Sequence, residues 1–181
     1  MNLPNLITLG RLLCVPLAIW LVLADDLGAA FWLFVAAGLS DAIDGFIAKR
    51  FDQRSRLGAL LDPIADKALL VSMYVTLGVA GHLPNWLVIL VVFRDVLIIG
   101  GFLLIAALAQ AMRWEPLFVS KLNTALQIAL VAVVLGRLGL GVPDFGLGTV
   151  LIYAVAATTV ISGVAYLVRW AGALAGVEED T

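Results

Sequence analysis

Six long apolar segments dominate this sequence, and they limit what the chain can fold into. Short breaks separate the segments, and 63% of the 181 residues are hydrophobic. A membrane-spanning helix needs about 20 mainly apolar residues, and the mean hydropathy of +1.09 is far above that of a soluble domain. We therefore predict an all-α integral membrane protein with six transmembrane helices. The predicted spans are Asn5–Ala24, Leu27–Lys49, Gly58–Gly81, Trp86–Ala111, Leu117–Leu135 and Gly146–Trp170.

The distribution of basic residues predicts how these spans are oriented. Lys49, Arg50, Arg54 and Arg56 crowd the second break, whereas Arg137 is the only basic residue in the breaks on the other side. Cytoplasmic loops carry the excess of Lys and Arg, and short connections make neighbouring helices antiparallel. We expect a multi-pass protein of the inner or plasma membrane of a bacterium, with both termini in the cytoplasm.

Charge and cysteine content exclude several classes of protein. The formal net charge is −2, and the chain has no basic cluster that could neutralise a run of phosphates, so we expect no nucleic-acid partner. The single cysteine, Cys14, rules out an intrachain disulfide and a cysteine-based metal cluster. No internal repeat or linker is evident, which favours one domain over residues 1–181 with a disordered acidic tail from about 174 to 181.

Two pairs of aspartates flank the charged second break. Asp41 and Asp44 are three residues apart, and Asp62 and Asp66 are four apart, so each pair lies on one face of its predicted helix. A short connection brings the two pairs face to face. Four carboxylates repel one another unless cations neutralise them, and oxygen ligands suit hard divalent cations such as Mg²⁺ or Mn²⁺. We therefore expect two such cations, in a site that clamps phosphoryl oxygens.

Two other interpretations of the aspartates stay open at this point. Single charged residues near an interface are usually helix caps or snorkelling side chains. Intramembrane aspartates with Arg and Lys also mark cation- or proton-coupled transporters, although those usually have repeats and midplane carboxylates. Four aspartates interleaved with Gly45, Ala48 and Gly58 favour a site, because small residues let a bulky group approach the backbone.

The spacing of these residues resembles the signature of the CDP-alcohol phosphatidyltransferase family. Every spacing of the signature is matched over 26 positions, by Asp41, Asp44, Gly45, Ala48, Gly58, Asp62 and Asp66. Lys49 stands where the family usually has Arg, and it lacks the bidentate guanidinium. The resemblance implies a six-helix, usually homodimeric fold with an active site that opens to the cytoplasm.

The resemblance also implies a role for each signature residue. Asp66 would be the catalytic base, and would take the proton of an acceptor hydroxyl that attacks the phosphorus attached to diacylglycerol and expels CMP. The implied ligands of two Mg²⁺ or Mn²⁺ ions are Asp41, Asp44, Asp62 and Asp66. The residues implied to bind the CDP group are Asn5, Thr8, Asp41, Asp44, Gly45, Ala48, Lys49, Gly58 and Asp62.

Three polar clusters in apolar surroundings are candidates for binding the acceptor. Asn5, Thr8 and Arg11 follow one another at spacings of three, so they form either a helix cap with a snorkelling arginine or a substrate-lining face. Arg94 and Lys121 are the only cations inside the fourth and fifth predicted spans, and a buried cation needs an anion. Arg94 either pairs internally, for example with Asp95 or a signature aspartate, or binds the phosphate of an anionic acceptor. The predicted acceptor-binding residues are Arg94, Lys121, Thr124, Arg11 and Arg50.

Two further motifs are similar to one branch of the family. "RDV" in the fourth predicted span and "SKLNTALQ" at the start of the fifth resemble the eukaryotic-type cardiolipin synthases. This branch implies transfer from CDP-diacylglycerol to phosphatidylglycerol, with cardiolipin and CMP as products. The related phosphatidylglycerophosphate synthases use glycerol 3-phosphate. Both acceptors are anionic, so charge alone does not distinguish them.

Overall fold

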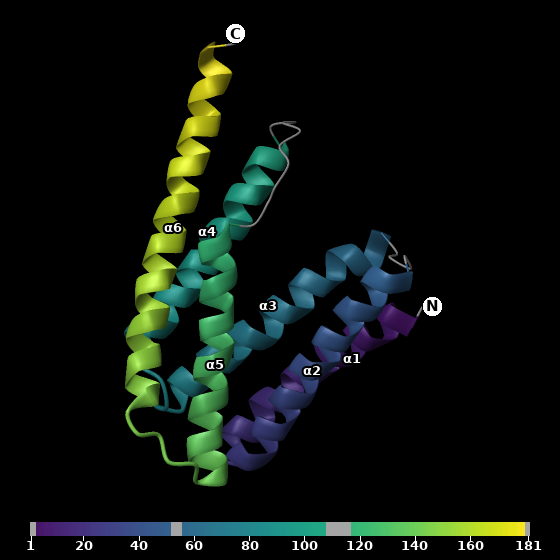
Figure 1. Ribbon diagram of the computed structural model, residues 1–181, viewed down its shortest axis with the longest axis vertical. Helices are drawn as coiled ribbons and strands as arrows, with labels where there is room; N and C mark the ends of the chain where they lie inside the picture. The colour runs from purple at the N-terminus through teal and green to yellow at the C-terminus, as the bar shows by residue number, and fades with distance from the viewer. Residues whose placement is uncertain (1–2, 52–55, 108–116, 180–181) are drawn as a thin grey trace. The chain divides into compact units, whose positions relative to one another are not determined.

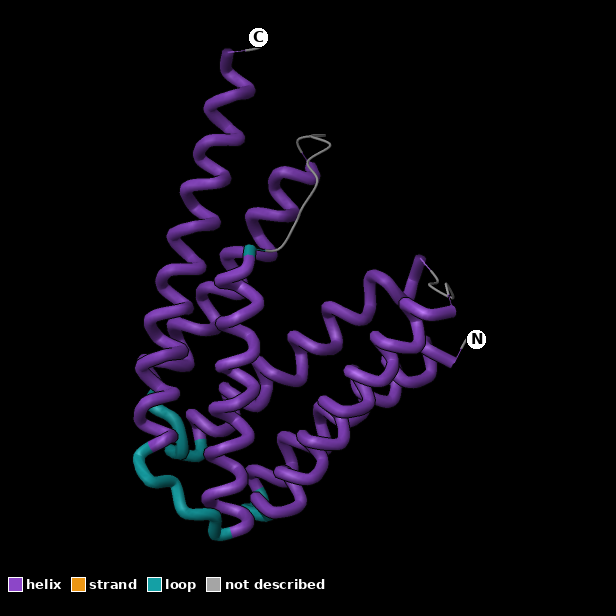
Figure 2. Tube along the Cα trace, in the orientation of Figure 1, coloured by secondary structure: helices purple, strands orange, loops and turns teal. Residues whose placement is uncertain are grey.

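The computed structural model is helical throughout most of the chain that it describes, which comprises residues 3–51, 56–107 and 117–179. Side chains are described for part of these ranges, and those of residues 41–51 and 56–66 are not among them. No strand occurs in the described ranges (Figures 1 and 2). The helices are α1 (Leu3–Leu23), α2 (Leu27–Phe51), α3 (Arg56–Val79), α4 (Asn85–Ala107), α5 (Phe118–Leu140) and α6 (Leu147–Glu179).

The predicted number and order of helices are confirmed, but two helices continue five or more residues beyond their predicted ends. α5 continues to Leu140 rather than Leu135, and α6 continues to Glu179 rather than Trp170. The sequence that follows Trp170 is rich in alanine and glutamate, which favour helix, and extending an existing helix needs no new nucleus. Residues 174–179 are therefore helical, which corrects the prediction of a disordered tail over that range.

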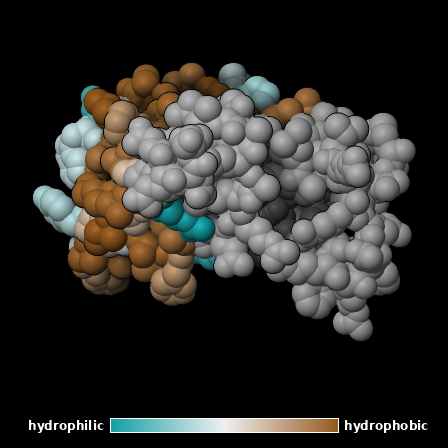
Figure 3. All heavy atoms as spheres, turned by 90° about the horizontal axis from the view of Figure 1, so that it is seen from above, coloured by the Kyte–Doolittle hydropathy of each residue, from teal (hydrophilic) through white to brown (hydrophobic). Residues whose placement is uncertain are grey.

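Large apolar side chains are exposed along several helices. On α4 they recur every three or four residues, so they share one face of that helix. Figure 3 shows hydrophobic side chains over most of the described surface in that view. The exposed set on α4 is Trp86, Ile89, Phe93, Val96 and Ile99.

Two of the described helices are long and apolar enough to cross a membrane. They are α5 and the part of α6 from Leu147 to Gly172. Shorter apolar stretches lie in α1, α2 and α3, at Leu12–Leu23, Leu27–Ser40 and Lys67–Val79. The helix count thus agrees with six spans, while the length and composition of the described residues support two of them.

A tight turn joins α1 to α2. At the end of α1 the N–H of Asp26 donates to the carbonyl of Leu21 at 2.9 Å, and Asp25 adopts a left-handed conformation with φ of 60°. This is the pattern of a helix C-cap. The Asp26 carboxylate then accepts a hydrogen bond of 3.1 Å from the N–H of Ala29, which caps the start of α2. One short segment therefore ends one helix and begins the next.

Glycine supplies the same geometry at the ends of α3 and α5. Gly81 and Gly141 have φ values of 78° and 70°, which other residues adopt only with strain. At the start of α6 the Asp144 carboxylate accepts a hydrogen bond of 2.6 Å from the N–H of Gly148. These caps satisfy backbone groups that a helix end would otherwise leave unpaired.

The chain packs as two compact units that share α5. Unit 1 comprises Met1–Pro84 and Val131–Gly148, and unit 2 comprises Asn85–Leu130 and Thr149–Thr181. In unit 1, α1 packs against both α2 and α3. The end of α5 meets the start of α2 so closely that a Cβ atom on Gly139 would overlap the backbone of Leu27 and Gly28.

Candidate functional site

The predicted metal ligands belong to consecutive helices of unit 1. Asp41 and Asp44 lie in α2, and Asp62 and Asp66 lie in α3, in each case within helical backbone. Helical geometry therefore puts the members of each pair on one face of their helix, as predicted. The side chains of all four lie outside the described residues. Among the side chains that the structure does describe, no cluster of three His, Cys, Asp or Glu could hold a metal.

The other predicted substrate-binding residues fall into two groups. For the first group the side chains lie outside the described part of the chain, and its members are Asn5, Thr8, Arg11, Gly45, Ala48, Lys49, Arg50 and Gly58. The second group has described side chains, all in unit 2, and consists of Arg94, Lys121 and Thr124. For three of the five predicted acceptor-binding residues, the geometry is therefore described, in unit 2.

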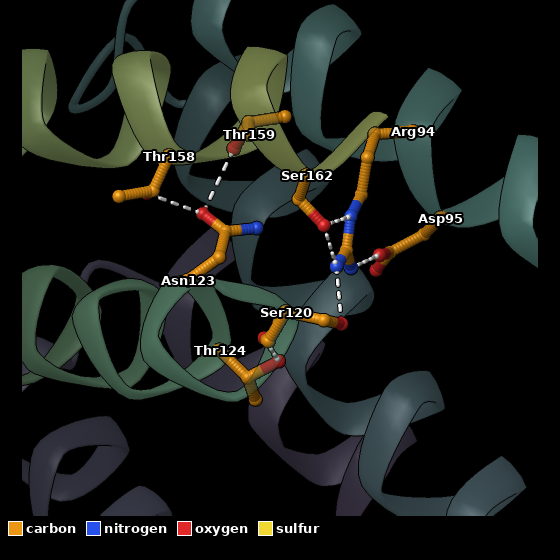
Figure 4. A network of polar contacts seen from close by, with 8 residues as sticks. All are labelled: Arg94, Asp95, Ser120, Asn123, Thr124, Thr158, Thr159 and Ser162. Atoms are coloured by element: carbon orange, nitrogen blue, oxygen red, sulfur yellow. Dashed lines mark hydrogen bonds and ion pairs between the residues drawn. The ribbon is translucent and has the colours of Figure 1, made fainter. Parts of the chain in front are cut away.

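Arg94 lies at the meeting point of three helices. Its side chain is 3% exposed. From α4 it donates through Nη1 to Asp95 Oδ1 at 2.7 Å, and through Nη2 to Ser120 Oγ on α5. Ser162 Oγ on α6 accepts hydrogen bonds from Nε at 3.3 Å and from Nη2 at 2.7 Å (Figure 4). The guanidinium thus connects α4, α5 and α6 through side chains alone.

The contact with Asp95 is an ion pair inside the protein. The two side chains are 3% and 4% exposed, and the N–O distance is 2.7 Å. Internal pairing with this neighbour was one of the two alternatives for Arg94, and the structure contains it. Pairing lowers the cost of burying either charge, and removal of one charge would raise the cost of burying the other. Phosphate binding by Arg94 stays a prediction.

A second polar contact links α5 to α6 one turn further along. Asn123 is fully buried, and its Oδ1 accepts hydrogen bonds from Thr158 Oγ1 at 2.8 Å and from Thr159 Oγ1 at 3.0 Å (Figure 4). Its Nδ2 has no hydrogen-bond partner among the described residues. A hydrogen bond between polar side chains of two apolar helices helps to hold those two helices together.

We call a set of buried and half-buried polar side chains of α5 and α6 the polar seam. Its members are Ser120, Asn123 and Gln127 on α5, at spacings of three and four, and Thr158, Thr159 and Ser162 on α6, where both threonines lie within one turn of the serine. Lys121 is exposed, and Thr124 is half-buried and donates to the carbonyl of Ser120 at 3.1 Å. Lys121 is therefore available to a partner, whereas the seam faces the interior of unit 2.

Sequence reasoning missed the contribution of α6. The sixth predicted span gave no functional signal, although "TTVIS" places three hydroxyl groups at helical spacing in an otherwise apolar helix. A serine or threonine in such a helix commonly bonds to its own backbone, as Thr158 does to the carbonyl of Ala154 at 2.8 Å. The spacing of the three hydroxyls, rather than any one of them, is the signal that indicates a partner helix.

The described part of the chain is helical, with the predicted aspartate pairs on two consecutive helices and a buried Arg94–Asp95 pair in unit 2. Residues 1–164 match the model of the family described as CDP-alcohol phosphatidyltransferase. The chain therefore belongs to the CDP-alcohol phosphatidyltransferases, a family of transferases, which confirms the resemblance seen in the signature.

Several curated proteins are similar to this chain. It is 34% identical over 193 residues to the chloroplastic CDP-diacylglycerol–glycerol-3-phosphate 3-phosphatidyltransferase 1 of Oryza sativa subsp. japonica, covering 94% of this chain and 57% of that protein. It is 36% identical over 147 residues to the CMP-forming cardiolipin synthase of Rattus norvegicus, covering 72% and 49%. It is 34% identical over 182 residues to a cardiolipin synthase and mitochondrial hydrolase fusion protein of Schizosaccharomyces pombe, covering 92% and 31%. The chain spans about half the length of the first two of these relatives, and less of the third.

Proposed function

We propose that this protein transfers a phosphatidyl group from CDP-diacylglycerol to the hydroxyl of phosphatidylglycerol, giving cardiolipin and CMP. The observation that carries the proposal is the family match over residues 1–164, which includes the whole aspartate signature. The name of the rat relative, a CMP-forming cardiolipin synthase, supports phosphatidylglycerol as the acceptor. The match includes residues of both compact units, which favours a single catalytic domain over residues 1–181.

In the proposed reaction one bond to phosphorus replaces another. The acceptor hydroxyl oxygen attacks the phosphorus attached to diacylglycerol, and the bond from that phosphorus to the CMP oxygen breaks. CMP leaves with the electron pair, and Asp66 takes the proton of the hydroxyl as general base. Gly45, Ala48 and Gly58 leave room for the cytidine diphosphate, because small side chains allow close approach to the backbone.

The aspartates fit a pair of divalent cations by their chemistry and their helical placement. Asp41 and Asp44 on α2 and Asp62 and Asp66 on α3 offer carboxylate oxygens, the ligands that Mg²⁺ and Mn²⁺ prefer. When bound, the cations would neutralise charge on the phosphoryl oxygens. Asn5, Thr8 and Lys49 complete the proposed contacts to CDP.

The proposed acceptor carries a phosphate, so its site needs positive charge. Lys121 is the exposed candidate in unit 2, with Thr124 one turn away on α5. Arg11 and Arg50 are candidates from α1 and α2. A cation beside a phosphate gains a charge-assisted hydrogen bond, which is roughly twice as strong as a neutral one.

A second candidate acceptor is glycerol 3-phosphate. The rice relative is named as a glycerol-3-phosphate 3-phosphatidyltransferase, and its similarity covers 94% of this chain. The two reactions share the donor, the leaving group and the attacking hydroxyl, and they differ in whether the acceptor carries acyl chains. The same site residues would serve both.

We further propose that the protein is a membrane-embedded homodimer. The exposed apolar face of α4 and the two helices long enough to span a membrane support embedding in lipid. The lipid substrates of the proposed reaction also require access from a membrane.

A CMP-release assay tests the proposed function. The purified protein receives CDP-diacylglycerol with Mg²⁺ or Mn²⁺, and phosphatidylglycerol or glycerol 3-phosphate is offered in separate reactions. We expect CMP in the phosphatidylglycerol reaction, and CMP in the glycerol 3-phosphate reaction alone would favour the second candidate. If neither acceptor releases CMP, the proposed function is wrong.

A further inference from the structure

The hydrogen bonds of Arg94 leave little of its guanidinium available to a ligand. A guanidinium has five N–H donors. Asp95, Ser120 and Ser162 accept four hydrogen bonds from them. Ser162 bridges Nε and Nη2, which is the edge that would hold a phosphate in a bidentate contact. The side chain is also 3% exposed, so a phosphate could reach it only if unit 2 rearranged.

The charge of Arg94 is also compensated already. Asp95 lies 2.7 Å from Nη1 and is equally buried, so the pair carries no net charge. Adding a phosphate anion would bring an uncompensated negative charge into the interior of the helices, which is costly. The same anion beside an exposed lysine would keep much of its hydration. Burial and charge therefore both favour Lys121 over Arg94 as the acceptor contact.

Arg94 and the polar seam fix the rotation of α5 about its own axis. Ser120 binds Arg94 of α4, and Asn123 binds Thr158 and Thr159 of α6. Ser120 and Asn123 are three residues apart, so they share one face of α5. Lys121 follows Ser120 directly and is about 100° around the helix, on the exposed side. Any rotation of α5 that moved Lys121 would break hydrogen bonds to two other helices.

We infer that Arg94 is a positioning residue: with Asp95, Ser120 and Ser162 it holds α5 in the orientation that presents Lys121 to the phosphate of the acceptor. This inference rests on the proposed function, since it assigns a role within the acceptor site. Arg94 itself does not contact the acceptor. The acceptor class that Lys121 meets is a phosphate mono- or diester with a free hydroxyl.

Variants of the Arg94–Asp95 ion pair test whether Arg94 positions α5 or binds the acceptor phosphate itself. Arg94→Met removes the buried cation beside the Asp95 carboxylate, and we expect it to lower the thermal midpoint by roughly 6 to 20 °C. The double variant Arg94→Met with Asp95→Leu replaces the pair by apolar side chains, and we expect it to recover most of this loss. Its KM for the acceptor should still rise about 3- to 10-fold, because α5 is no longer held by Arg94, and this rise should disappear when the same two changes are made in Lys121→Gln.

Lys121→Gln provides the complementary measurement at an exposed position. We expect the KM for the acceptor to rise about 10- to 100-fold, from loss of one charge-assisted contact. The KM for CDP-diacylglycerol and the thermal midpoint should not change. Leu122→Ala, at the neighbouring exposed position, is the matched control and should leave the acceptor KM unchanged.

Two results would overturn the inference. One is an acceptor KM that the double variant leaves unchanged, or raises by the same factor with Lys121→Gln as without it, since Arg94 would then not act through Lys121. The other is a folded Lys121→Gln variant with an unchanged acceptor KM. If the wild-type protein releases no CMP with any acceptor, the proposed function fails instead, and the thermal cycle still measures the coupling between Arg94 and Asp95.

Discussion

The crossing of α5 and α2 provides a quantitative test of the packing in unit 1. At Gly139 a Cβ atom would overlap the backbone of Leu27 and Gly28. A side chain could rotate away from such an overlap, but a helix backbone moves only if the two helices separate. Gly139→Ala therefore forces a shift of α2, the helix that carries Asp41 and Asp44.

The expected size of the effect follows from two opposing contributions. Overpacking of a tight contact costs about 1 to 3 kcal/mol, with backbone overlap at the upper end. Alanine in a helix regains up to about 1 kcal/mol relative to glycine. The net destabilisation is about 2 kcal/mol, which for a chain of this length lowers the thermal midpoint by roughly 4 to 8 °C.

The assay is thermal unfolding of the purified protein in detergent, with Gly136→Ala as the control on the same helix. A Cβ atom there would lie 3.4 Å from the Phe31 ring, an ordinary contact. We expect Gly136→Ala to melt at or slightly above the wild-type midpoint, from its gain in helix propensity. The reasoning is refuted if Gly139→Ala melts at or above the wild-type midpoint, because the two helices would then have room for a side chain.

Three further predictions concern the reaction and unit 2. Asp66→Asn should lower CMP release by about 10²- to 10⁴-fold without lowering the thermal midpoint. The control Asp25→Asn, in the α1–α2 turn, should retain activity. Equal rates of CMP release in both variants would show that Asp66 is not the general base. Chelation of divalent cations should abolish CMP release, and Mg²⁺ or Mn²⁺ should restore it; activity that persists in the chelator argues against bound cations. Gly101→Ala should destabilise the protein by about 1 to 3 kcal/mol, because a Cβ atom there would overlap the ring of Trp170; an unchanged melting curve would show that the ring moves aside freely.

The order of helices could be predicted because each one is an apolar segment bounded by charged or glycine-rich residues. The end of α5 could not. Gly136, Arg137 and Gly139 read as a break, since glycine disfavours helix and arginine is charged. In the structure Gly139 is instead the residue that lets α5 meet the backbone of α2. Tertiary packing here outweighs local propensity, and packing partners are not visible in one segment of sequence.

In the predicted site, too, the spacing of residues along one helix could be predicted from the sequence, whereas contacts between helices could not. The helical spacing of the aspartates was available from the sequence, because it depends on positions three and four residues apart. For Arg94 the sequence could show that an anion is needed, but Asp95 and a substrate phosphate satisfy that need equally well. Ser162 could not be assigned to Arg94, since the two are 68 residues apart and only the packing of α6 brings them together.

The central claim is that this chain transfers a phosphatidyl group with release of CMP, and the most direct test is to quantify both products of one reaction. With CDP-diacylglycerol, phosphatidylglycerol and Mg²⁺ or Mn²⁺, we predict that CMP and cardiolipin form in equal amounts, and that Asp66→Asn lowers the rate of both by about 10²- to 10⁴-fold. A folded wild-type protein that forms no CMP with phosphatidylglycerol or glycerol 3-phosphate would contradict the claim.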